Sequence, residues 1–117
     1  MVKLSLVMPA IRTERWLNVY NSIQVDFPWE LIIVSPYELP ETLKNKNNIK
    51  FFKDMGSPVR ASCIGASLAE GKYLTWICDD SLVFSKTLSK AVNILDNSIN
   101  GRLVVVTKYL EACTEVH

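Results

Sequence analysis

Apolar residues in this chain follow two spacings, one typical of strands and the other of helices. Short apolar runs predict buried strands at residues 3–8, 29–34, 49–53, 72–77 and 102–106. Between these runs, apolar positions recur every three or four residues, which is the spacing of one helix face. This second pattern predicts helices at residues 13–24, 59–69 and 82–95, with a short one at 41–46.

Strands that alternate with helices predict an α/β fold with a mainly parallel sheet. In such a sheet, ligands bind beyond the carboxyl ends of the strands. Those ends here carry Pro9-Ala10, Ser35-Pro36 and Asp79-Asp80. We therefore expect these three pairs to lie at one edge of the sheet.

Several residues carry more specific structural expectations. Thr13 is predicted to cap the first helix, and Gly71 to end the helix at 59–69. Trp16, Trp76 and Leu82 occupy apolar positions of their elements and are predicted to lie in the core.

The adjacent acids Asp79 and Asp80 are the most informative feature of the sequence. They end an apolar run, where ionised carboxylates repel each other and are costly to bury without a partner. One interpretation is that they hold a divalent cation and, through it, phosphate oxygens. The other is that one acid caps the following helix by accepting backbone N–H bonds, or has a role in the turn before it. The pair by itself favours neither interpretation.

Composition narrows the class of protein. The chain has 117 residues, of which 49% are hydrophobic, so we expect a single folded domain over residues 1–117. With 13 basic and 12 acidic residues, the net charge of +1 gives no reason to expect a nucleic-acid partner. No apolar run approaches the roughly 18 residues of a spanning helix, so no membrane span is expected.

The sequence lacks the residue patterns of zinc sites, of histidine-assisted nucleophilic catalysis and of the common nucleotide-binding loops. Cys63, Cys78 and Cys113 are too scattered for a zinc site, and we expect reduced, mostly buried thiols in a cytoplasmic protein. The single histidine, His117, makes a Ser-His or Cys-His pair improbable. Neither the glycine-rich dinucleotide fingerprint nor the P-loop motif occurs.

Four pieces of the chain follow one another at suitable spacing: an opening strand with its proline at 4–9, a second strand at 29–34, a helix with an A-x-G-x-Y element at 61–73, and Cys78-Asp79-Asp80. Together they resemble the N-terminal, nucleotide-sugar-binding half of family 2 glycosyltransferases, which have the GT-A fold. The resemblance covers about residues 3–95. Cys78-Asp79-Asp80 falls at the position of the family's D-x-D metal motif.

The resemblance implies transfer of a sugar from a nucleotide diphosphate donor to a hydroxyl of an acceptor that the sequence does not identify. A Mg²⁺ or Mn²⁺ ion would bridge a carboxylate and the diphosphate. Asp80 matches the metal ligand, and Asp79 would contact the ribose or the metal shell. The loop with Pro9, Ala10 and Arg12 would lie against the base and ribose.

The chain also departs from the family's pattern. Cys78 replaces the first acid of the motif, and Ser35-Pro36 replaces the acidic pair that reads the base. A serine hydroxyl can bond a uracil edge, which favours a UDP-type donor, although Ser35 also fits an ordinary turn residue. Ser62 stands where the family has an arginine. Arg60, two positions earlier, either reaches a phosphate or is a solvated charge on the helix.

The family's second half, which supplies the acceptor site and general base, has no counterpart here. We expect a truncated form, either a fragment or a natural short version, whose catalytic base is not assigned. A half-domain would expose a sheet edge and apolar surface, which predicts self-association.

Three alternatives to a glycosyltransferase donor domain stay open. The chain could be a non-catalytic nucleotide-sugar-binding module, or a structural or oligomerisation domain that has lost its ligand. The third is a flavodoxin-like or response-regulator-like domain, where an acidic pair binds Mg²⁺. Such folds usually place their acids after the first strand, which here ends in Met8-Pro9-Ala10.

Overall fold

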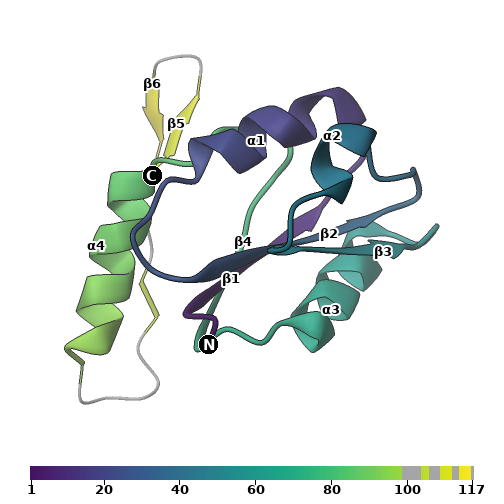
Figure 1. Cartoon of the computed structure of the whole chain (residues 1–117). Helices are drawn as coiled ribbons and strands as arrows, with labels where there is room; N and C mark the ends of the chain where they lie inside the picture. The colour runs from purple at the N-terminus through teal and green to yellow at the C-terminus, as the bar shows by residue number, and fades with distance from the viewer. Residues whose placement is uncertain (99–103, 106–108, 112–113, 117) are drawn as a thin grey trace.

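The structure is a computed structural model of the chain, and it describes residues 1–98, 104–105, 109–111 and 114–116 (Figure 1). Four strands form a fully parallel sheet in the order β3-β2-β1-β4. Their bounds are β1 Leu4–Pro9, β2 Trp29–Ser35, β3 Ile49–Lys53 and β4 Tyr73–Trp76. The α/β fold with a mainly parallel sheet is thus confirmed.

Helices cover both faces of this sheet (Figure 1). A 3₁₀ turn, η1, leads into α1, and the short α2 lies on the same side of the sheet, whereas α3 lies on the other side. Their bounds are η1 Thr13–Arg15, α1 Trp16–Ser22, α2 Glu41–Lys44, α3 Pro58–Leu68 and α4 Ser85–Asp96. A short antiparallel pair, β5 Tyr109–Glu111 and β6 Thr114–Val116, follows α4 in the chain.

The order of the strands creates a switch point beside β1. From β1 the chain moves outward to β2 and β3 on one side, and then returns to place β4 on the other side of β1. Parallel sheets of this kind bind ligands at the carboxyl ends of the strands, next to such a switch point. The loops that follow β1, β2 and β4 are therefore the segments positioned to form a site.

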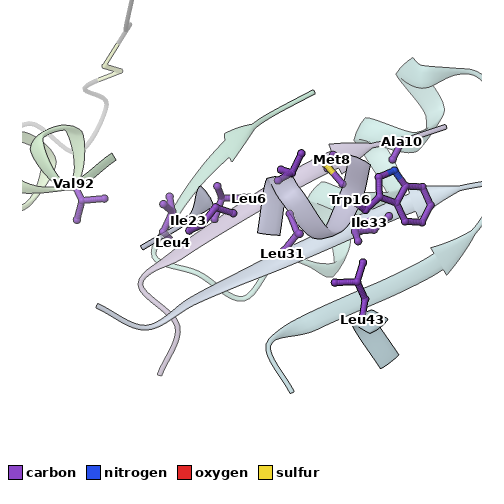
Figure 2. Close-up of a cluster of buried hydrophobic side chains, with 11 residues drawn as sticks. Leu4, Leu6, Met8, Ala10, Trp16, Ile23, Leu31, Ile33, Leu43 and Val92 are labelled. Atoms are coloured by element: carbon purple, nitrogen blue, oxygen red, sulfur yellow. The ribbon is translucent and has the colours of Figure 1, made fainter. Parts of the chain in front are cut away.

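The core follows the alternation of side chains along the strands. On one face, alternate residues of β1 and β2 pack against α1, α2 and α4, and Figure 2 shows this cluster with Trp16 near Ala10 and Ile33. On the other face, Val7, Ile32 and Val34 pack against Ala61 of α3. The central strands β1 and β2 are thus mostly apolar on both sides, as the continuous apolar runs predict.

Two glycines allow backbone segments to approach closely. A β-carbon on Gly65 of α3 would lie 2.3 Å from Cγ1 of Val7, and one on Gly71 would lie 2.6 Å from Oγ of Ser5. The prediction that Gly71 ends the helix is wrong, because the cap is Ala69 in an extended conformation. Gly71 is instead needed because the segment before β4 lies directly against β1.

We expect Gly71→Ala to lower the free energy of unfolding by about 1–3 kcal/mol, because the new methyl would also lie 2.7 Å from the backbone nitrogen of Ser5. Urea denaturation measures this loss. Gly56→Ala is the matched control, since the nearest atom to its methyl belongs to the flexible Arg60 side chain. Equal losses in the two variants would contradict the steric explanation.

The expectation that β4 is a buried strand is wrong, because β4 is an edge of the described four-stranded sheet. Leu74 and Trp76 are 39% and 54% exposed, so Trp76 is not a core residue. They pair with Ser5 and Val7 and therefore point to the α3 side of the sheet, where α3 packs on β1 and β2. Leu82 is also exposed, which corrects its predicted place in the core. Self-association through this surface stays a prediction.

Some local predictions need correction. Thr13 lies inside η1 and makes no cap, since Arg12 occupies the cap position without a side-chain bond. Cys63 and Cys78 are free thiols, but both are exposed rather than buried. Cys113 lies outside the described residues, as does most of the predicted strand at 102–106, of which residues 104 and 105 have no regular structure. In the described part of the chain, no helix has the length and apolarity needed to cross a membrane.

Candidate functional site

The loops that follow β1 and β2 form the walls of an open hollow of about 570 Å³ at the carboxyl edge of the sheet. Ile11 and Thr13 line it from the β1 side, and α2 contributes Glu41 and Lys44. The segment after β2 supplies the remaining lining residues Tyr37, Glu38, Leu39 and Pro40. The hollow therefore lies where the topology predicts a ligand site.

Asp79 ties the end of β4 to the loop after β1. Its Oδ2 accepts hydrogen bonds from the backbone nitrogens of Ile11 and Arg12 at 2.7 and 2.6 Å, and from Nε1 of Trp16 at 3.2 Å. Its Oδ1 pairs with Nη1 of Arg12 at 2.9 Å. The carboxylate, which is 3% exposed, is thus satisfied by four donors from one segment.

These contacts explain how a buried acid stays ionised. Burial by itself would raise the pKa of Asp79, but the hydrogen bonds from Arg12, Ile11 and Trp16 together outweigh it and hold the pKa below its ordinary value. Asp79 is therefore a carboxylate at neutral pH, with most of its hydrogen-bonding capacity used by the protein.

Asp80 has the opposite environment. It is exposed, and its side chain makes no hydrogen bond or ion pair with any residue that the structure describes. A capping role for one of the two acids is wrong, because α4 begins at Ser85 and its cap residue is Phe84, without a side-chain bond. Both acids do lie in the turn that follows β4. Asp80 is thus the acid of the pair with oxygens available to a ligand.

No protein-only metal cage is present in the described residues, where no three His, Cys, Asp or Glu side chains come together. This arrangement still fits one kind of metal site. Mg²⁺ is commonly bound through one or two carboxylates together with the phosphates of a substrate, which complete its coordination. Asp80 fits that role.

Ser35 is buried at the end of β2 rather than exposed in the hollow. Its Oγ accepts a hydrogen bond from the backbone nitrogen of Tyr37 at 3.1 Å, which is the geometry of a serine turn. This bond orients the segment that leads to Tyr37, a residue that is 54% exposed and lines the hollow. Contact between Ser35 and a base stays a prediction, and Tyr37 is the accessible aromatic side chain there.

Of the remaining predicted residues, Pro9, Ala10 and Arg12 lie beside the site, whereas Arg60 does not. Ala10 is buried, and its nitrogen donates to the oxygen of Val34, so Pro9 and Ala10 continue the pairing of β1 with β2. Arg12 pairs with Asp79, although its side chain is 44% exposed. Arg60 lies apart in the first turn of α3, where its Nε bonds both oxygens of Asp54, and it neither lines the hollow nor contacts Asp79.

Sequence reasoning missed the part that Trp16 plays in this site. Trp16 was predicted only as a core residue, and its ring is fully buried. A buried indole usually needs an acceptor for its N–H group. That requirement was the available signal, and the acceptor is Asp79.

No family model matches the chain. The poly(ribitol-phosphate) beta-N-acetylglucosaminyltransferase TarS of Staphylococcus aureus strains Mu50 and MW2 aligns with it at 25% identity over 141 residues, covering 99% of this chain and 25% of each relative. The chain therefore spans about a quarter of the length of these curated relatives.

Two solved structures share the fold. The crystal structure of S. aureus TarS 1–349 matches with a TM-score of 0.65 and 22% identity over 95% of this chain and 42% of that one. A second crystal structure of S. aureus TarS matches with a TM-score of 0.65 and 23% identity over 81% of this chain and 20% of that one. This chain is thus similar in sequence and fold to part of a glycosyltransferase.

Proposed function

We propose that this chain is a glycosyltransferase domain that binds a nucleotide diphosphate sugar, with Asp80 as its ligand for Mg²⁺ or Mn²⁺. The observation that carries the proposal is the alignment of 99% of the chain with a glycosyltransferase. The open hollow and the two acids at the carboxyl edge support it, because parallel sheets of this kind bind ligands there.

The hollow suits the nucleoside part of such a donor. Tyr37 is an exposed aromatic residue, and Ile11 is an exposed apolar residue that lines the same hollow. Bases bind readily to surfaces of this kind, because stacking on an aromatic side chain needs no particular base edge. The sequence favours UDP through Ser35, which is buried beside Tyr37 rather than exposed in the hollow, so UDP is kept as the nucleotide to be tested first. TarS is named for transfer of an N-acetylglucosaminyl group.

Asp80 would hold the divalent cation together with the diphosphate of the donor. The metal, when bound, neutralises charge that develops on the leaving diphosphate. Arg12 adds a positive side chain that is 44% exposed at the same edge. The acceptor and the general base are assigned to none of the described residues.

Calorimetric titration of UDP, with and without Mn²⁺, tests this proposal. We expect Mn²⁺ to strengthen binding by at least about tenfold, or ~1.4 kcal/mol, because one carboxylate and the diphosphate share the ion. Asp80→Asn should remove this gain. Asp26→Asn is the matched control, because Asp26 is also exposed but lies at a separate hollow lined by Lys3 and Asp96.

Each outcome assigns a different function. No binding of UDP or UDP-N-acetylglucosamine by the wild type in Mn²⁺ would overturn the proposed function and favour a structural domain. Binding that is indifferent to Mn²⁺ and to Asp80→Asn would overturn the metal role and favour a non-catalytic nucleotide-binding module. Loss of the Mn²⁺ gain in the Asp26 control would show that the effect is not specific to Asp80.

A further inference from the structure

The adjacent acids Asp79 and Asp80 differ in their burial and in their hydrogen bonds. Asp79 is 3% exposed and accepts four hydrogen bonds from the protein. Asp80 is exposed and has no hydrogen-bond or ion-pair partner among the described residues. Two carboxylates in such different surroundings are suited to different work.

The segment that Asp79 holds has few other attachments. The side chain of Ile11 is 57% exposed, so this residue gains little from packing. The nearest backbone bonds are those from Ala10 nitrogen to Val34 oxygen, and from Arg15 nitrogen to Arg12 oxygen. In the stretch between these two bonds, the backbone N–H groups of Ile11 and Arg12 both donate to Asp79.

The same segment forms one wall of the hollow through Ile11 and Thr13. Asp79 also holds the guanidinium of Arg12 and, through Nε1, the indole of the buried Trp16. The Asp79 carboxylate, which follows β4, therefore holds the wall of the hollow, the Arg12 guanidinium beside it and the buried Trp16 indole. The partners lie 63 to 68 residues from Asp79 in sequence, so this is a tertiary tie rather than a local turn.

We propose that Asp79 is a positioning residue, which fixes the loop between β1 and η1 and thereby shapes the nucleotide-binding hollow, while Asp80 alone of the pair meets the ligand. The part of this proposal that concerns ligand rests on the proposed function. Asp79 acts through the backbone of Ile11 and Arg12, so its loss loosens the hollow without removing the metal ligand.

Asp79→Asn and Asp80→Asn separate the two roles when each variant is studied by NMR and by UDP titration. For Asp79→Asn we expect shifts of the Ile11 and Arg12 amides and the Trp16 indole N–H, together with UDP binding weakened about tenfold. The relative gain from Mn²⁺ should be retained. For Asp80→Asn we expect those three resonances to stay in place while the gain from Mn²⁺ is lost.

Hydrogen exchange on the wild type tests the positioning role even if the Asp79→Asn variant fails to fold. The Ile11 and Arg12 amides should exchange at least about tenfold more slowly than solvent-exposed amides, although both side chains are exposed. Unprotected amides, or an Asp79→Asn spectrum with the three resonances in place, would overturn the positioning role. Loss of the Mn²⁺ gain in a folded Asp79→Asn would instead make Asp79 a direct ligand.

Failure of the proposed function can be distinguished from failure of the positioning role of Asp79. A wild type that binds no UDP in Mn²⁺ overturns that function and the ligand part of this inference with it. The exchange and resonance measurements need no nucleotide, so they still decide whether Asp79 fixes the loop.

Discussion

Replacing Trp16 with alanine is expected to lower the free energy of unfolding by about 3–5 kcal/mol, the usual cost of removing a fully buried large aromatic side chain. The Trp16 side chain is 0% exposed and belongs to the cluster with Met8, Ala10 and Ile33 (Figure 2). Alanine would leave a cavity and also remove one of the donors to the buried Asp79 carboxylate. Urea denaturation followed by circular dichroism measures the loss, which is a large part of a typical domain's stability.

Two variants make this prediction specific. Trp76→Ala removes the same side chain from a position that is 54% exposed, and we expect a loss within about 1 kcal/mol. Trp16→Phe keeps most of the ring but removes the Nε1 donor, and it should fall between the two alanine variants. Similar midpoints for Trp16→Ala and Trp76→Ala would mean that Trp16 is not the centre of this core.

The two tryptophans show what the sequence could predict about the fold. Trp16, Val19 and Ile23 recur at helical spacing, and all three are buried where that spacing predicts. Trp76 lies in an equally apolar run, but burial of a strand depends on its position in the sheet. The run of apolar residues does not specify that position, and β4 is an edge of the described four-stranded sheet.

The candidate site shows the same division. The alternation of strands and helices was enough to bring Pro9-Ala10, Ser35-Pro36 and Asp79-Asp80 to one edge of the sheet, and the topology confirms this placement. The different surroundings of the two acids were beyond prediction. They depend on donors 63 to 68 residues away, whose approach is set by the tertiary structure and not by local pattern.

A polar network near the amino ends of the strands, centred on the buried Glu30, was also not predicted from the sequence pattern. Oε2 of Glu30 accepts the Ser5 hydroxyl at 2.6 Å and the Glu70 backbone nitrogen at 2.7 Å, and Oε1 pairs with Nζ of Lys50 at 2.9 Å. Ser5 in turn accepts a hydrogen bond from the Gly71 nitrogen. Glu30 therefore joins β1, β2 and β3 to the segment between α3 and β4.

We expect Glu30→Ala to lower the free energy of unfolding by about 2–4 kcal/mol at neutral pH, because it leaves the Ser5 hydroxyl and the Glu70 backbone N–H without their acceptor. Lys50 loses one of its partners but keeps the Leu68 oxygen and the Glu70 carboxylate. Glu30→Gln keeps the shape and one acceptor oxygen, so its loss should be smaller. Urea midpoints measure both. Glu38→Gln is the control, since it removes an exposed ion pair with Lys53 and should shift the midpoint little.

The pH dependence of stability identifies the charge of Glu30 as the cause. Burial opposes its ionisation, but hydrogen bonds from Glu70, Ser5 and Lys50 outweigh burial and lower its pKa. The unfolded chain therefore takes up the proton first as the pH falls, at a pKa of about 4.3. The stabilisation is complete above that value and is lost as the pH falls through the lower folded pKa. Glu30→Gln should flatten the loss of stability between about pH 5 and pH 3, and an unchanged slope would mean that Glu30 is not held as the anion.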